Sequence, residues 1–124
     1  MKRIFISAPY RAKTQARVER NIERARNIGR RYAIAGELPM VPHLAVGYME
    51  NTPEETPMAL YHCIELVDLC DELHYFGEPT GGMQMEIAHA RGIGIPVRGF
   101  PLDCQDSEPE LDELMALVGA EGTD

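Results

Sequence analysis

One glutamate stands out in the stretch Pro79–Ala90 (PTGGMQMEIAHA), where paired glycines lead into a mostly apolar helical segment. With about 100° between successive helical residues, Met83, Ile87 and Ala90 define the buried face, and Glu86 lies near its edge. A carboxylate placed there can serve as a nucleophile or as a general acid or base. The alternative is an ordinary glutamate that is stabilised only by the positive end of the helix dipole.

The loop before this helix contains residue types that bind phosphate. Thr80, Gly81 and Gly82 offer a hydroxyl and free backbone N–H groups at a helix N-terminus. Neither the P-loop pattern GxxxxGK[ST] nor the dinucleotide fingerprint GxGxxG is present, so the loop alone is weak evidence. Arg11, at the end of the first expected strand, can supply a bidentate cation to the same anion.

Other polar residues are weaker candidates. His43 follows the second expected strand, although a lone histidine there is more often a hydrogen-bonded structural group than a catalyst. Glu65 and Asp68 are candidates for a second acid, and each is equally consistent with a solvated helix residue. The other histidines have no metal-ligand spacing relative to one another, so no metal site and no cofactor are expected.

Composition narrows the class of protein. A chain of 124 residues suits one domain, expected over residues 1–119 with a short tail at 120–124. The net charge of −8 argues against nucleic-acid binding, although ten of the twelve Lys and Arg residues lie in the first 31 positions. No apolar run approaches the length of a membrane span or a signal peptide, so a cytoplasmic protein is expected. Cys63 and Cys70, two helical turns apart, are expected to be small core residues.

Strand-like and helical segments alternate along the chain. Thr14 is the expected N-cap of a long helix that runs to about Ala35, because Val18, Ile22 and Tyr32 recur with helical spacing. Pro39 marks the second strand as an edge strand. The expected strands are Arg3–Ser7, Leu38–Val41, Glu72–Phe76 and Ile95–Arg98; the other expected helices are a turn within Leu44–Met49, one beginning near Pro57, one from about Gly82 to Arg91, and a final one around Leu111–Val118.

This order predicts a doubly wound α/β domain of the flavodoxin or Rossmann type, with a parallel sheet of four or five strands in the order 2-1-3-4(-5). Ligands of such folds bind beyond the carboxyl ends of the strands, where the strand order reverses. The loops Ser7–Arg11, Pro42–His43 and Gly77–Met83 should therefore line one cleft. The expected substrate-binding residues in these loops are Ser7, Pro9, Tyr10, Arg11, His43, Gly77, Thr80, Gly81, Gly82 and Met83.

Several motifs resemble the nucleoside 2-deoxyribosyltransferase-like superfamily. They are FISAPYR at the end of the first strand, RNIERA in the long helix, PH after the second strand, and CDELHYFGEPTGGMQMEIAHARGIGIPV. The resemblance extends to Phe100 and is closest to small, mostly uncharacterised members. Characterised members cleave or transfer the N-glycosidic bond of deoxynucleosides or their 5′-monophosphates. The resemblance implies that Glu86 is the nucleophile, and that Thr80 and Arg11 hold a phosphate.

The chain departs from that family at one position. Characterised members carry an aspartate eight residues before the one that opens the third strand, and here that position is Cys63. Either Glu65 takes over its role, or the activity is altered or lost. The expected function is thus N-glycosidic cleavage or transfer, with a non-catalytic nucleotide-binding module as the alternative and cleavage of a dinucleotide as a third idea. The resemblance and the apolar segment LAVGYM also predict a homodimer or higher homo-oligomer.

Overall fold

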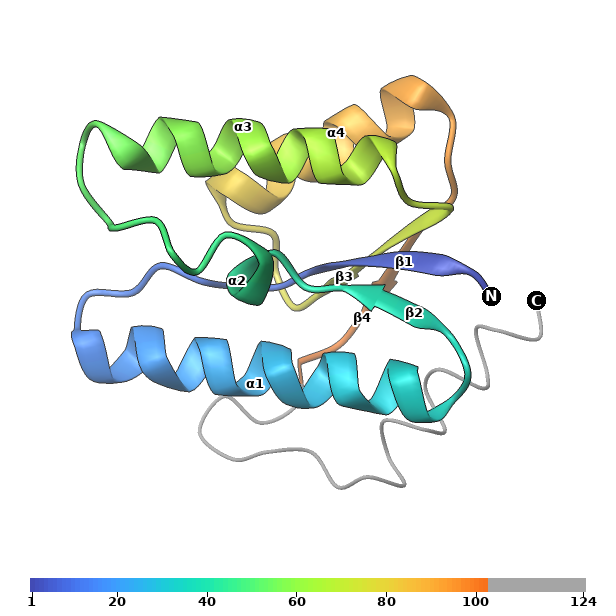
Figure 1. Ribbon diagram of the computed structural model, residues 1–124, viewed down its shortest axis with the longest axis horizontal. Helices are drawn as coiled ribbons and strands as arrows, with labels where there is room; N and C mark the ends of the chain where they lie inside the picture. Colours follow the sequence, from blue (N-terminus) through green and yellow to red (C-terminus); the bar gives the residue numbers. More distant parts are fainter. Residues whose placement is uncertain (103–124) are drawn as a thin grey trace.

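Strands and helices alternate along the chain, and all the strands of the sheet are parallel (Figure 1). The computed structural model describes residues 1–102. The expected final helix, the tail and Cys104 lie outside the described residues. The elements are β1 (Arg3–Ser7), α1 (Gln15–Ile34), β2 (Leu38–Met40), α2 (Pro42–Ala45), α3 (Glu55–Asp68), β3 (Glu72–Phe76), α4 (Gly81–Ile93) and β4 (Val97–Phe100).

The strand order in the sheet is β2-β1-β3-β4, which confirms the predicted doubly wound α/β fold. After β1 the chain adds β2 on one side and then β3 on the other. The strand order therefore reverses between β1 and β3, where folds of this kind bind ligands. Pro39, which has no N–H for a sheet hydrogen bond, lies in β2 at the edge of the sheet, as the sequence predicts.

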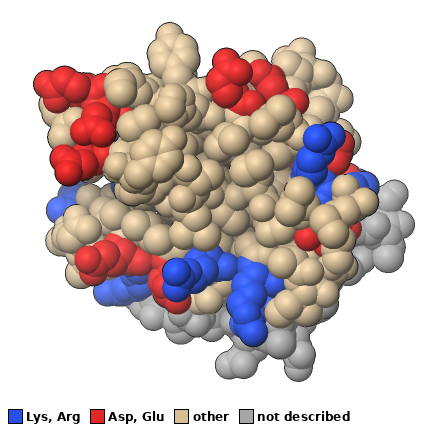
Figure 2. Space-filling view, viewed as in Figure 1, with Lys and Arg blue, Asp and Glu red and all other residues tan. Residues whose placement is uncertain are grey.

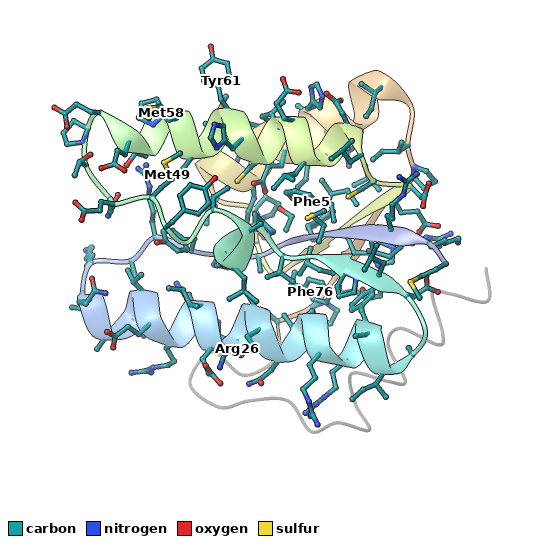
Figure 3. All side chains as sticks on the ribbon, viewed as in Figure 1. Phe5, Arg26, Met49, Met58, Tyr61 and Phe76 are labelled. Atoms are coloured by element: carbon teal, nitrogen blue, oxygen red, sulfur yellow. The ribbon has the colours of Figure 1, made fainter. Side chains whose placement is uncertain are left out.

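Helices cover both faces of the sheet, with α1 on one face and α3 and α4 on the other (Figure 1). Alternate side chains of a strand point to opposite faces. Ile4 and Ile6 therefore pack with Tyr32 of α1, whereas Phe5 packs with Val67 and Ile87 of α3 and α4. Figure 3 shows Phe5 and Phe76 on opposite sides of the sheet. Ser7 follows the alternation of Phe5 and so points toward α4.

Local signals account for most of the element boundaries. The Thr14 side chain accepts a hydrogen bond from the Arg17 backbone N–H at 3.2 Å, which confirms the predicted N-cap of α1. The glycine that follows this helix, Gly36, has a φ of +93°, a conformation that other residues rarely adopt. The chain can therefore turn there into β2.

Several predicted boundaries are wrong, and β2, expected to reach Val41, ends at Met40. The helical turn expected within Leu44–Met49 is α2, four residues long and beginning at Pro42, because proline is favoured in the first turn of a helix. The strand expected at Ile95–Arg98 is β4, which begins two residues later at Val97. Gly94 ends α4 in the left-handed conformation, and Pro96 cannot donate a sheet hydrogen bond, so pairing begins after it.

Charged groups lie both inside and on the surface of the molecule. The buried Glu72 carboxylate accepts hydrogen bonds from Lys2 Nζ at 2.5 Å and from His74 Nε2 at 2.9 Å. Tyr32 Oη lies 2.7 Å from Nδ1 of the same histidine.

Figure 2 shows basic and acidic side chains together along the edge of the molecule that α1 forms. Among residues 1–102, no helix is long and apolar enough to cross a membrane.

The Glu72 network makes the stability of the fold dependent on pH. Burial alone would raise the pKa of Glu72, but hydrogen bonds from Lys2 and His74 outweigh it and lower the pKa below its ordinary value. A lowered carboxyl pKa contributes stability at pH values above the ordinary pKa, and this contribution is lost as the pH falls through the folded-state pKa. We expect Glu72→Gln to reduce the free energy of unfolding at pH 7 by about 1–3 kcal/mol.

Urea denaturation followed by circular dichroism at pH 7 and pH 3 measures this effect. The difference between the wild type and Glu72→Gln should shrink at pH 3, where the wild-type carboxylate approaches protonation. Glu19→Gln, which removes an exposed carboxylate from α1, is the control and should change the stability little at either pH. Equal stability of wild type and Glu72→Gln at pH 7 would contradict a stabilising role for the network.

Candidate functional site

Glu86 is buried on α4, where this helix packs beside the end of β1. The Ser7 Oγ donates a hydrogen bond of 2.8 Å to Glu86 Oε1. Ser7 is the last residue of β1 and is itself fully buried. The carboxyl group is thus fixed at the carboxyl end of the sheet, next to the point where the strand order reverses.

Cys63 of α3 is the second polar neighbour of Glu86. Its buried thiol donates to the Glu86 carboxyl group. Burial, together with the nearby negative charge of Glu86, raises the pKa of Cys63 to about 12. The thiol therefore stays protonated at neutral pH, and it acts as a hydrogen-bond donor rather than as a nucleophile or a base.

The environment of Glu86 makes its carboxyl group hard to ionise. Burial raises the pKa of Glu86 to about 7, although the hydrogen bonds from Ser7 and Cys63 act in the opposite direction. A carboxyl group with this pKa exchanges its proton near neutral pH. Such a perturbed group in a cavity is a candidate for chemistry, because structural carboxylates are usually either solvated or paired with a cation.

Glu86 lines a cavity of about 470 Å³, a size typical of small-molecule sites. Its walls are mostly apolar, and Figure 3 shows Met49, one of the residues that form them, on the loop between α2 and α3. Arg11 and Thr80 supply polar groups to the lining. The residues that line the cavity around Glu86 include Ala8, Tyr10, Arg11, His43, Val46, Met49, Glu50, Asn51, Thr56, Leu60, Cys63, Thr80, Gly81, Gly82, Met83 and Met85.

The N-terminus of α4 is open toward this cavity. Thr80 is the N-cap of α4 in an extended conformation, but its hydroxyl makes no capping hydrogen bond. A Cβ atom added to Gly81 or Gly82 would meet no atom within 4 Å. Packing within the described residues therefore does not require glycine at these two positions, which leaves room for a ligand to approach the backbone.

His43 serves mainly to position the loop after β1. The buried Nε2 of His43 donates to the carbonyl oxygen of Pro9 at 3.0 Å, and the ring meets Tyr10 edge-on. Burial lowers the pKa of His43, so the ring is neutral and its Nδ1 is an acceptor. Within residues 1–102, Nδ1 has no hydrogen-bond partner. The histidine thus belongs to the site through its packing, as a hydrogen-bonded structural group.

Most of the residues expected from the sequence meet around the cavity. Ser7 lies behind Glu86 rather than in the cavity wall. Pro9 and Gly77 line a neighbouring hollow of about 730 Å³. Glu65, the expected second acid, is exposed on α3 and does not line the cavity, so the structure does not bring it to Glu86. The expected residues that line the cavity itself are Tyr10, Arg11, His43, Thr80, Gly81, Gly82, Met83 and Glu86.

Sequence reasoning missed the part of the cavity that comes from α3 and the loop before it. This part includes Met49, Glu50, Asn51 and Leu60. The one signal for this part in the sequence is the apolar segment LAVGYM, which instead predicts contacts between subunits. Among the described residues, no group of three His, Cys, Asp or Glu side chains could hold a metal ion.

Folding should depend on the protonation of Glu86. Because its pKa is about 7 in the folded protein and 4.5 ordinarily, the folded state retains a proton that the unfolded state releases. The free energy of unfolding should therefore fall as the pH rises from about 4.5 to 7, by on the order of 2–3 kcal/mol. Glu86→Gln cannot titrate and should lose this fall, which makes it the more stable protein at pH 8.

Urea denaturation at pH 5 and pH 8 measures the difference. Glu65→Gln removes an exposed carboxylate from the neighbouring helix α3 and is the matched control; its pH dependence should follow the wild type. If Glu86→Gln keeps the full pH dependence of the wild type, Glu86 does not have a raised pKa.

Comparison with known families gives a match over nearly the whole described region. The family model described as "Domain of unknown function (DUF7768)" matches residues 2–100, which include every described strand and helix and Glu86 with its neighbours Ser7 and Cys63. No curated protein matches the chain. Because the model covers most of the sequence, the chain belongs to the DUF7768 family.

Proposed function

We propose that this protein cleaves or transfers the N-glycosidic bond of a (deoxy)nucleoside or a nucleoside 5′-monophosphate, with Glu86 as the nucleophile. The observation that supports this most strongly is a buried carboxyl group, fixed by Ser7 at 2.8 Å, in the wall of a cavity of about 470 Å³. The resemblance to the nucleoside 2-deoxyribosyltransferase-like superfamily gives the glutamate at this position the same role.

The proposed reaction has two steps. An oxygen of ionised Glu86 attacks the anomeric carbon C1′, the C1′–N bond breaks, and its electron pair leaves with the base, which takes up a proton. The product is an ester between the sugar and Glu86. Water then attacks C1′ and releases the sugar and the carboxylate, or a second base takes the place of water in a transfer.

The phosphate of a monophosphate substrate would lie at the N-terminus of α4. The Thr80 hydroxyl is not used for capping, and Gly81 and Gly82 leave the backbone accessible. Arg11 is exposed at the same cavity and forms no ion pair with any residue in the range 1–102. A guanidinium group facing helix N–H groups is a suitable environment for a phosphate dianion.

A non-catalytic nucleotide-binding or sensing module is the second candidate. It is favoured because the residue of α3 beside Glu86 is a cysteine and not a second acid. The neighbour of Glu86 from α3 is the thiol of Cys63, which stays protonated because burial and Glu86 raise its pKa to about 12. Glu65 is exposed elsewhere on the helix, and Glu50, the other carboxylate in the cavity lining, is also exposed. A module of this kind would be stabilised by a nucleotide and would form no product.

Self-association also belongs to the proposal. Leu44, Tyr48, Met58 and Tyr61 are exposed apolar side chains on α2, α3 and the loop between them. Figure 3 shows Met58 and Tyr61 on the outer side of α3. Exposed side chains of this size favour contact with another protein surface. The homo-oligomer stays a prediction.

The test of catalysis is release of free base from the four 2′-deoxynucleosides and their 5′-monophosphates, followed by liquid chromatography. We expect release from at least one of them, with a kcat/KM that rises with pH up to about 7 as Glu86 ionises. Glu86→Gln should reduce the rate by about 10³-fold or more at every pH, because the amide cannot form the ester.

A control variant and a binding measurement complete this test. Glu65→Gln should retain the wild-type rate within about twofold, because its carboxylate does not line the cavity. Thermal stabilisation of the wild type by a nucleotide without any base release would favour the binding module over the enzyme.

A further inference from the structure

A second hollow, of about 730 Å³, lies beside the cavity that contains Glu86. We call it the basic hollow, because Arg11, Arg17 and Arg24 line it and Glu78 is the one acidic residue in its described lining. The Asn21 side chain also faces it and donates to the Tyr10 carbonyl oxygen at 3.0 Å. At neutral pH the described lining thus carries three positive charges and one negative charge.

The basic hollow is built by the first half of α1. Arg17, Asn21 and Arg24 are spaced i, i+4 and i+7, so they lie on one face of the helix over about 10 Å. Further along the helix, the side chains that pack on the sheet are apolar and include Ile28 and Tyr32. Figure 1 shows that α1 begins beyond the carboxyl end of β1. The packed face of α1 therefore becomes basic where the helix extends past the sheet.

Arg24 is the least exposed of the three arginines, with 7 % of its surface accessible. A guanidinium group loses hydration when it is buried, so such positions are rare unless the charge is used or compensated. Arg17 and Arg24 each take part in a further interaction within the protein.

The two spaces share part of their lining. Arg11 and Thr80 line both the cavity with Glu86 and the basic hollow. These are the residues that the proposed function assigns to the first phosphate of a nucleotide. A chain of phosphates that begins there can continue toward Arg17 and Arg24 while the sugar stays beside Glu86.

We propose that the basic hollow binds the second and third phosphates of the substrate, so that the preferred ligand is a nucleoside 5′-diphosphate or triphosphate rather than a monophosphate. The inference rests on the proposed function for the position of the sugar. A mostly apolar cavity with one carboxyl group suits a nucleoside, and a neighbouring hollow with three arginines suits phosphates.

Isothermal titration calorimetry of the full chain tests the proposal with the 2′-deoxynucleoside 5′-monophosphates and 5′-triphosphates of the four bases, in EDTA. The Glu86→Gln variant is titrated in parallel, so that turnover does not distort the affinities. We expect a triphosphate to bind about tenfold or more tightly than its monophosphate. The triphosphate affinity should also fall more steeply with salt.

Substitutions in α1 identify the residues responsible. Arg17→Gln should weaken triphosphate binding by about five- to tenfold and monophosphate binding by less than about twofold. Arg24→Gln should act in the same direction; if it fails to fold, the exposed Arg17 still decides the question. Arg26→Gln is the matched control, because Arg26 lies on the same helix, pairs with Glu23 at 3.8 Å and lines neither space.

The outcomes separate this inference from the proposed function. Equal affinity for monophosphate and triphosphate, equal weakening of both by Arg17→Gln, or no binding of any nucleotide would overturn the inference. Base release from monophosphates with no preference for triphosphates would leave the proposed function intact and reject the basic hollow as a phosphate site. Arg17-dependent triphosphate binding without any base release would support the basic hollow and contradict the enzyme.

Discussion

The site depends on the burial of one carboxyl group at the meeting point of β1, α3 and α4. Glu86 has two neutral hydrogen-bond donors, Ser7 and Cys63, and no cation paired with it in the described part of the chain. Burial without a cation raises the pKa of Glu86 to about 7, which is a cost to folding once the group is ionised. Glu72 shows the opposite arrangement in the same protein: it is buried but paired with the exposed Lys2, and its pKa is lowered. Glu72 therefore stabilises the fold, whereas ionised Glu86 reduces the stability of the fold at the cavity where a ligand can enter.

The parallel sheet explains why the polar residues gather at one end. Ser7 ends β1 and Thr80 is the N-cap of the helix that follows β3, so the reversal of strand order brings these neighbouring ends together. Alternation along β1 then directs Ser7 toward α4 and leaves Ile4 and Ile6 for the core with α1. The core with α1 and the site thus use opposite faces of the same strand, and Phe5 packs in the second core on the side of the site. The basic half of α1 extends past this end of the sheet and places three arginines beside the cavity.

Much of the fold could be predicted because its signals are local. Glu72–Phe76, the N-cap Thr14, the edge strand with Pro39 and the order of the sheet are all confirmed. Local signals could not show whether Glu65, the expected second acid, faces Glu86, because this depends on the rotation of α3 about its own axis. Cys63 and Val67 are buried one turn apart, and Glu65 is two residues from Cys63, about 200° around the helix. Pro57 indicates where the helix begins, but it does not indicate which side of the helix meets Glu86. Only packing against α4 decides that. The structure places Cys63 on the side of α3 that meets Glu86. Cys63 is also the position at which this chain departs from the family that it resembles.

The most direct test of Glu86 as a nucleophile is mass spectrometry of the protein after rapid acid quenching during reaction with 2′-deoxynucleotides. A covalent glycosyl ester is the one species that requires a carboxylate nucleophile, so its location identifies the catalyst. The proposed function predicts an added sugar phosphate on the proteolytic peptide that contains Glu86, absent from Glu86→Gln. Base release with no adduct on that peptide, or with an adduct that persists in Glu86→Gln, would contradict it.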